Sequence, residues 1–112
     1  MANRLIKETG SQDLSAAAFS LTAEAQGQML LGLITLSASE GVTETVTLTI
    51  DQFEGSNYDV LLDSSVLNDE EDYIYKSGGS TIILNNGDKL TLACTNANTT
   101  GVVYGKILLI ET

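Results

Sequence analysis

The stretch that decides the fold is NNGDKLTLACTN, residues 85 to 96. Asn86 and Gly87 are a favoured pair for a two-residue hairpin turn, and the apolar residues that follow fall on every second position. Such alternation is typical of a β-strand with one buried face and one wet face. The stretch therefore predicts a tight turn and a half-buried strand, with residues 82 to 84 paired to that strand across the turn.

The same alternation recurs along much of the chain. Residues 45 to 50 carry three apolar side chains on one face and three threonines on the other, and residues 58 to 62 place Tyr58 on the apolar face of a further strand. Short alternating runs, with turn signals about every 8 to 12 residues, are typical of β-sandwiches. We therefore expect an all-β fold, one antiparallel β-sandwich of about eight strands with a jelly-roll or an immunoglobulin-like topology. The core residues expected from the two clearest strands are Val46, Leu48, Ile50, Leu90, Leu92 and Cys94.

Length and composition fit a single domain. The chain has 112 residues, 43% of them hydrophobic, and domains usually hold about 100 to 150 residues. The first 13 residues show no clear period and contain two of the five basic residues, Arg4 and Lys7. We expect residues 1 to 13 to form an extended N-terminal arm, either loosely held or ordered only against a partner, and residues 14 to 112 to form the sandwich.

Two segments, residues 30 to 36 and 107 to 110, are apolar on both faces. Strands of this kind are central in a sheet or covered by something outside the domain. Because the outer face of a small antiparallel sandwich normally meets water, these segments predict a partner subunit on one of them.

The charge balance excludes several classes of partner. Fifteen acidic residues against five basic ones give a net charge of −10, which repels phosphate backbones and anionic lipid surfaces. We therefore expect no nucleic-acid or membrane partner. The first residues also lack the apolar core and cleavage site of a secretory signal peptide, so we expect synthesis in the cytoplasm without export by that route.

The residue types needed for common catalytic sites are scarce. The chain has no histidine, which is the usual general base at neutral pH. Its one cysteine, Cys94, lies on the apolar face of a predicted strand, where we expect a core residue rather than a nucleophile. We therefore expect no catalytic residues, no cofactor and no enzymatic activity. Tryptophan is absent, so the candidates for stacking on a sugar ring are Tyr58, Tyr73, Tyr75 and Tyr104.

One acidic run has the composition of a cation site. Calcium takes about six to eight oxygen ligands, and the run offers several carboxylates, but it lacks the spacing and the glycine of an EF-hand loop. A solvated loop that opposes edge-to-edge aggregation is the favoured interpretation, and a calcium site stays open as the alternative. The run consists of Asp69, Glu70, Glu71 and Asp72, and a second, weaker oxygen cluster consists of Asp51, Glu54 and Asp59.

From residue 44 onward, the order of motifs resembles small β-sandwich proteins encoded among the virion-structure genes of tailed bacteriophages. The motifs are TVTLTID at 45 to 51, YDVLL at 58 to 62, GDKL at 87 to 90, TNAN at 95 to 98, and Tyr104-Gly105 in the last strand. The resemblance implies a non-enzymatic head decoration or cement protein on the capsid surface, bound to the major capsid protein or another virion protein. It also implies a homo-oligomer, a trimer or dimer, whose arms clamp neighbouring capsid subunits. The arm residues expected to contact the shell are Arg4, Leu5, Ile6 and Lys7.

Two other functions stay open at this stage. One is a carbohydrate-binding or host-surface-binding module that presents its loops to a glycan, with calcium at residues 69 to 72. The other is a tail or baseplate component of the same kind of particle.

Overall fold

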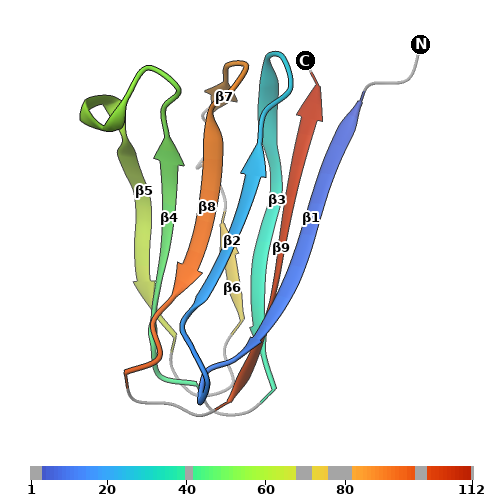
Figure 1. The fold of residues 1–112 in the computed structure, drawn as a ribbon. Helices are drawn as coiled ribbons and strands as arrows, with labels where there is room; N and C mark the ends of the chain where they lie inside the picture. The colour runs from blue at the N-terminus through green and yellow to red at the C-terminus, as the bar shows by residue number, and fades with distance from the viewer. Residues whose placement is uncertain (1–3, 40–41, 68–71, 76–81, 98–100, 112) are drawn as a thin grey trace.

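The computed structural model of the chain is a β-sandwich of two antiparallel sheets (Figure 1). The structure describes residues 4–39, 42–67, 72–75, 82–97 and 101–111. Nine strands lie within these residues, together with the short 3-10 turn η1 (Ser56–Tyr58). The predicted all-β antiparallel sandwich is therefore confirmed.

Each sheet is assembled from strands that are distant in the sequence. The five-stranded sheet has the order β1 (Leu5–Asp13), β9 (Val102–Glu111), β3 (Met29–Ala38) and β6 (Tyr73–Tyr75), with β7 (Ile83–Leu84) also paired to β3. The four-stranded sheet has the order β2 (Phe19–Glu24), β8 (Lys89–Cys94), β4 (Thr45–Asp51) and β5 (Val60–Val66).

The strand pairs are nested around the middle of the chain. β1 pairs with β9, β2 with β8, β3 with β6 and β4 with β5, and all four pairs are antiparallel. This is the arrangement of one long hairpin rolled into two sheets, which is the jelly-roll topology. The structure thus decides between the two topologies that the sequence left open.

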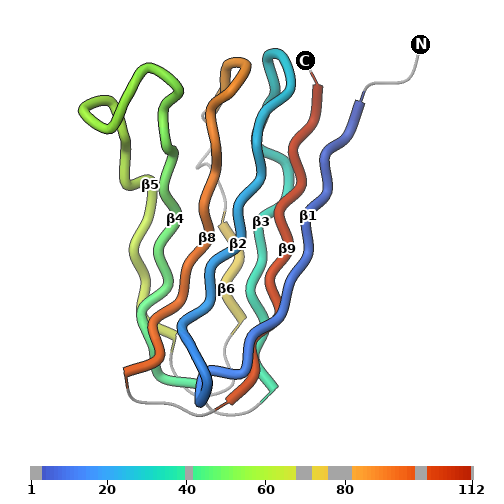
Figure 2. Tube along the Cα trace, viewed as in Figure 1, coloured from blue at the N-terminus to red at the C-terminus, as the bar shows by residue number. Residues whose placement is uncertain are grey.

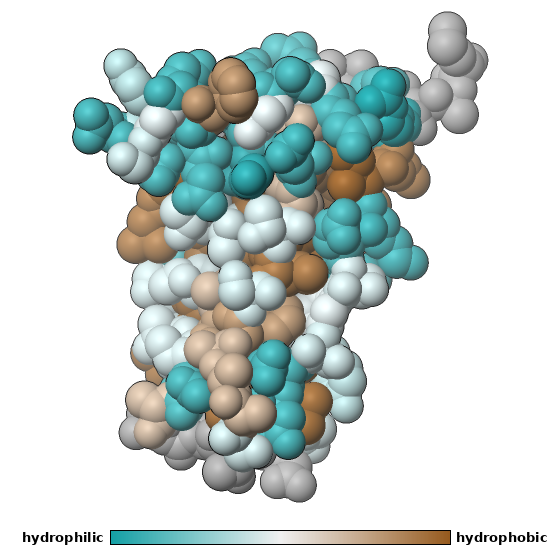
Figure 3. All heavy atoms as spheres, viewed as in Figure 1, coloured by the Kyte–Doolittle hydropathy of each residue, from teal (hydrophilic) through white to brown (hydrophobic). Residues whose placement is uncertain are grey.

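The core lies between the sheets and is formed by the alternating apolar residues. Leu48 and Leu92 face each other across β4 and β8, and both are completely buried. All six core residues expected from the two clearest strands are buried. The outer face of the four-stranded sheet is the wet face, with hydroxyl side chains at Ser20, Thr22, Thr45, Thr47, Thr49, Ser64 and Thr91. Figure 3 has the same viewpoint as Figure 1. It shows residues of intermediate hydropathy over the middle of the molecule and hydrophilic residues gathered at the upper end.

The expected alternation over residues 58 to 62 is wrong. Tyr58 lies in η1 and is 63% exposed, and β5 begins only at Val60, which is also exposed. The register then shifts, because Leu48 pairs with Asp63 whereas Thr49 pairs with Leu61. This bulge in an edge strand breaks the strict in-out order that the sequence pattern assumes.

The expectation of an arm separate from the sandwich does not hold for residues 5 to 13. These residues form β1, which pairs with β9 from Leu5 opposite Ile110 to Asp13 opposite Val102. Ile6 packs against the core from this strand. The sequence pattern hides the strand because β1 is an edge strand, so most of its side chains are exposed on both faces.

The Asn86–Gly87 turn is present, but it does not connect paired strands. The Asp88 N–H donates to the Asn85 carbonyl oxygen at 3.0 Å, and Gly87 has a φ of 90°, which favours glycine. β7 pairs with β3, whereas β8 pairs with β2 and β4, so the turn carries the chain from one sheet to the other (Figure 2). The buried Asp88 carboxylate fixes this crossing by accepting the backbone N–H groups of Asn85 and Phe53, both at 2.9 Å.

Candidate binding face

The two segments that are apolar on both faces are adjacent strands, β3 and β9, in the middle of the five-stranded sheet. Their inward residues, such as Ile34 and Ile107, are completely buried between the sheets. Most of their outward residues, on the outer side of the sheet, are half-buried by neighbouring strands, and Leu33 is 41% exposed; no further layer of the described chain covers them. This outer side is therefore the candidate binding face.

Four apolar residues from four strands form a continuous row across this face. Leu5 on β1 is opposite Ile110 on β9, Ile110 is opposite Leu30 on β3, and Leu30 is opposite Ile83 on β7. Leu5 is 59% exposed and Ile83 is 44% exposed, although both are large apolar side chains. We call Leu5, Ile110, Leu30 and Ile83 the apolar row.

A bulge in β3 shapes the middle of this row. The register shifts between Leu31, which pairs with Leu109, and Ile34, which pairs with Ile107. Gly32 lies in the bulge, and a Cβ there would come within 3.1 Å of Ile110 Cδ1 and 2.8 Å of the Leu108 carbonyl oxygen. The absence of a side chain at Gly32 therefore lets Ile110 lie close over the sheet.

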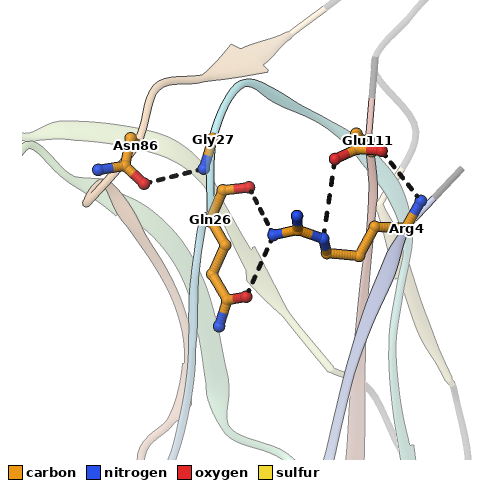
Figure 4. Close-up of polar contacts among 5 residues, drawn as sticks. All are labelled: Arg4, Gln26, Gly27, Asn86 and Glu111. Atoms are coloured by element: carbon orange, nitrogen blue, oxygen red, sulfur yellow. Dashed lines mark hydrogen bonds and ion pairs between the residues drawn. The ribbon is translucent and has the colours of Figure 1, made fainter.

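The four residues predicted to contact a shell lie at one end of this sheet but have different roles. Ile6 faces the core, whereas Leu5 and Lys7 face outward. Arg4 joins three chain segments: its Nε lies 3.7 Å from Glu111 Oε2, and its Nη1 lies 3.4 Å from both the carbonyl and the side-chain oxygen of Gln26 (Figure 4). These exposed contacts tie the beginning of β1 to the end of β9 and the β2–β3 turn.

The charge on the candidate binding face differs from that of the whole chain. Lys7 on β1 and Lys106 on β9 face outward, two residues and four residues from the apolar row. Among the described strand residues of this face, Asp13 at the far end of β1 is the one acidic residue. The face is thus apolar and basic, although the chain carries a net charge of −10.

Beyond Lys7 and Leu108, which border the apolar row, the same face is hollowed. The hollow has a volume of about 480 Å³, within the range of about 300 to 1,000 Å³ that small-molecule sites occupy. Its outward side chains form two cross-strand rows of three, centred on β9. We call the residues of these rows the outer hollow: Thr9, Lys106 and Thr35 in one row, and Ser11, Tyr104 and Ser37 in the other.

The floor of the outer hollow depends on two glycines. Gly10 and Gly105 pair across β1 and β9, and a Cβ on either would meet side chains of β2: Leu21 and Phe19 from Gly10, and the buried Phe19 ring from Gly105. A Cβ on Gly105 would lie only 2.5 Å from Phe19 Cζ, so the ring packs directly on the backbone of β9. Because the backbone replaces side chains here, the sheet comes closer to the core than it otherwise could.

The polar groups of the outer hollow are available to a ligand. Tyr104 is 51% exposed, and no hydrogen bond or ion pair joins its hydroxyl, the Lys106 ammonium or the four Ser and Thr hydroxyls to another described residue. Of the four tyrosines considered as sugar platforms, Tyr104 is the one in the hollow. Tyr73 is buried and donates a hydrogen bond to Asp63 Oδ2 at 2.7 Å.

The predicted cation site falls mostly on residues whose structure is not described. Asp69, Glu70 and Glu71 lie outside the described residues, and Asp72 is exposed beside β6. In the weaker cluster, Asp51 accepts the Thr91 hydroxyl at 2.9 Å and Asp59 accepts the Gln52 N–H at 2.9 Å. Among residues that the structure describes, no three His, Cys, Asp or Glu side chains come together as a metal-binding group.

Cys94 is buried, as the sequence predicts. Burial, together with the nearby Glu44 carboxylate, raises the pKa of its thiol to about 11. The thiolate, which is the reactive form, is therefore disfavoured at neutral pH.

The fold defines a class: a jelly-roll β-sandwich, here with a candidate binding face on the outer side of the larger sheet. In the part of the chain that the structure describes, no helix has the length and hydropathy of a membrane span.

Comparisons with known proteins support the fold and go no further. No protein-family model matches the sequence, and no curated protein matches it. A solved structure described as "Crystal structure of PirA" has the same fold, with a TM-score of 0.55 over 96% of this chain and 94% of that chain. The two sequences are 8% identical, so the similarity concerns the arrangement of strands alone.

Proposed function

We propose that this protein is a non-enzymatic structural component of a phage particle, a head decoration or cement protein that attaches through the apolar row. The observation that carries the proposal is the continuous outward row from Leu5 to Ile83 across four strands. A contiguous apolar patch on an outer sheet face is typical of a surface that another protein covers. Jelly rolls serve many functions, so the fold alone does not identify the partner. We choose a shell protein as the partner because the sequence motifs resemble those of virion proteins.

Charge supports a shell protein over a second copy as the occupant of the apolar row. Lys7 lies beside the row, and a partner with acidic groups around an apolar patch would complement it. A second copy would bring another Lys7 and another net charge of −10. The dimer or trimer expected from the resemblance would therefore have to use a surface other than the apolar row.

Attachment to particles tests the proposal. The protein is expected to band with particles purified on a density gradient, and particles made without it are expected to bind it when it is added back. Leu5→Glu should abolish this binding because it places a charge in the apolar row. Leu61→Glu is the matched control, since Leu61 is also 59% exposed but lies on β5 in the other sheet.

Three results would contradict the proposal. The first is absence of the protein from purified particles, and the second is equal binding of the Leu5→Glu and wild-type proteins. The third is a Leu5→Glu variant that lowers the oligomer mass in light scattering while particle binding is unchanged, which would assign the row to contacts between copies.

A further inference from the structure

The outer hollow combines three kinds of group that together recognise one class of ligand. An exposed aromatic ring offers an apolar surface to the C–H face of a sugar ring. Hydroxyls on both sides can donate and accept hydrogen bonds, as sugar hydroxyls do. Tyr104 supplies the ring at the centre of one cross-strand row, with Ser11 and Ser37 on either side.

Lys106 adds a charge requirement to this site. It lies two residues from Tyr104 on the same face of β9, so the two side chains are about 7 Å apart along the strand. That separation is close to the width of a sugar ring with one substituent. A ring stacked on Tyr104 can therefore place an exocyclic carboxylate beside the ammonium group, between the hydroxyls of Thr9 and Thr35.

The local charge favours an anion in spite of the net charge of the chain. None of the residues that line the hollow is acidic, and the next outward residues along β1 are Lys7 on one side and Asp13 on the other. Asp13 is two rows from Lys106, about 13 Å along the strand, whereas Lys7 is one row from it. Because exposed charges are screened beyond about 8 Å at physiological ionic strength, the two lysines act on a carboxylate at Lys106 more strongly than Asp13 does.

We propose that the outer hollow binds a sugar residue that carries a carboxylate, stacked on Tyr104 and paired with Lys106. The proposal goes beyond attachment through the apolar row. The near row of the hollow lies about 13 Å from the apolar row, since Lys106 is four positions before Ile110 on β9. A substitution in one surface therefore leaves the side chains of the other in place.

Titration of the wild-type protein, followed by nuclear magnetic resonance of its backbone amides, tests the proposal directly. The probes are 3′-sialyllactose, tri-galacturonic acid and neutral lactose. The two acidic sugars distinguish a sialic acid from a uronic acid, and lactose reports binding without a carboxylate. Resonances of β1, β3 and β9 around the hollow are expected to shift, with an affinity for one acidic sugar roughly tenfold above that for lactose.

Two pairs of variants separate stacking from charge. Tyr104→Ala should abolish binding of all three sugars, whereas Tyr58→Ala, which removes a tyrosine that is 63% exposed in η1, should not change it. Lys106→Gln should reduce the affinity for the acidic sugar to that for lactose. Lys89→Gln removes the same charge from the outer face of the other sheet and should leave that affinity within about twofold, since screening weakens distant charges.

Several outcomes would overturn the proposal. They are equal affinity for acidic and neutral sugars, equal effects of Lys106→Gln and Lys89→Gln, shifts away from the hollow, and no shift with any sugar at about 10 mM, a concentration that would nearly saturate a site with a dissociation constant of about 1 mM. Acetate that competes as strongly as the acidic sugar would show that the site recognises an anion and not a sugar. Leu5→Glu should retain sugar binding, and Lys106→Gln should retain particle binding, so failure of one proposal is distinguishable from failure of the other.

Discussion

The Phe19 ring lies against the backbone of Gly105, so closely that a Cβ on Gly105 would be 2.5 Å from Phe19 Cζ. Phe19 is the first residue of β2 in one sheet, and Gly105 lies in β9 of the other. The contact therefore joins the two layers directly beneath Tyr104 and Lys106. It couples the packing of the core to the shape of the outer hollow.

Gly105→Ala should destabilise the protein by about 1 to 3 kcal/mol, the usual cost of overpacking, because the Phe19 ring must move. Thermal or urea unfolding measures the change. A second substitution, Phe19→Leu, should recover part of the loss in the Gly105→Ala background, since the smaller side chain leaves room for the new methyl group. A Gly105→Ala variant that is as stable as the wild-type protein would contradict this contact.

The core assignment predicts different costs for inward and outward residues of β4 and β8. Leu48→Ala and Leu92→Ala should each lower the free energy of unfolding by roughly 2 to 5 kcal/mol, because both side chains are completely buried. Thr47→Ala should cost under about 1 kcal/mol, since Thr47 faces outward. Urea unfolding of the three variants measures these costs, and similar losses at all three positions would mean that the faces are assigned wrongly.

The sequence predicted what depends on local alternation and missed what depends on strand order. Val46 and Leu48 were placed correctly in the core because every second residue of a half-buried strand points inward. Their strand is preceded and followed by polar residues that make the period visible. β1 was missed because an edge strand exposes both faces, so Glu8 and Ser11 follow no apolar period.

The sequence indicated that residues 30 to 36 and 107 to 110 are apolar on both faces, but not which outward side chains of the candidate binding face lie side by side. The outward spacing of Tyr104 and Lys106 is visible in the sequence, as is that of Thr35 and Ser37. That these two pairs lie side by side follows from the antiparallel pairing of β3 with β9, across 60 or more residues of intervening chain. Long-range pairing of this kind leaves no local signal. For the same reason, the Asn86–Gly87 turn was wrongly predicted to connect two paired strands.

Removal of residues 1 to 12 should abolish cooperative unfolding. Without β1, the backbone groups of β9 that pair with β1 lose their partners, and the buried Ile107 and Leu109 become exposed at the new sheet edge. Circular dichroism during heating measures the loss. Lys7→Ala is the control within the same strand, because its side chain faces water, and it should change stability by under about 0.5 kcal/mol. A truncated protein that melts like the wild type would restore the idea of a separable arm.

Stability should fall as the pH rises from 9 to 11, because Cys94 ionises more easily in the unfolded chain. Burial and the Glu44 carboxylate raise the pKa of the folded thiol from 9.0 to about 11, so the unfolded state releases its proton first. The contribution of the buried thiol is therefore fully present below pH 9 and is lost as the pH approaches 11. Burial and the hydrogen bond to Asp63 also raise the pKa of Tyr73, which adds to the loss at the upper end of this range. Urea midpoints measured from pH 7 to 11 should fall less steeply for Cys94→Ala than for the wild type, and Tyr73→Phe isolates the tyrosine contribution. Identical pH profiles for wild type and Cys94→Ala would show that the thiol ionises as readily in the folded protein as in the unfolded chain.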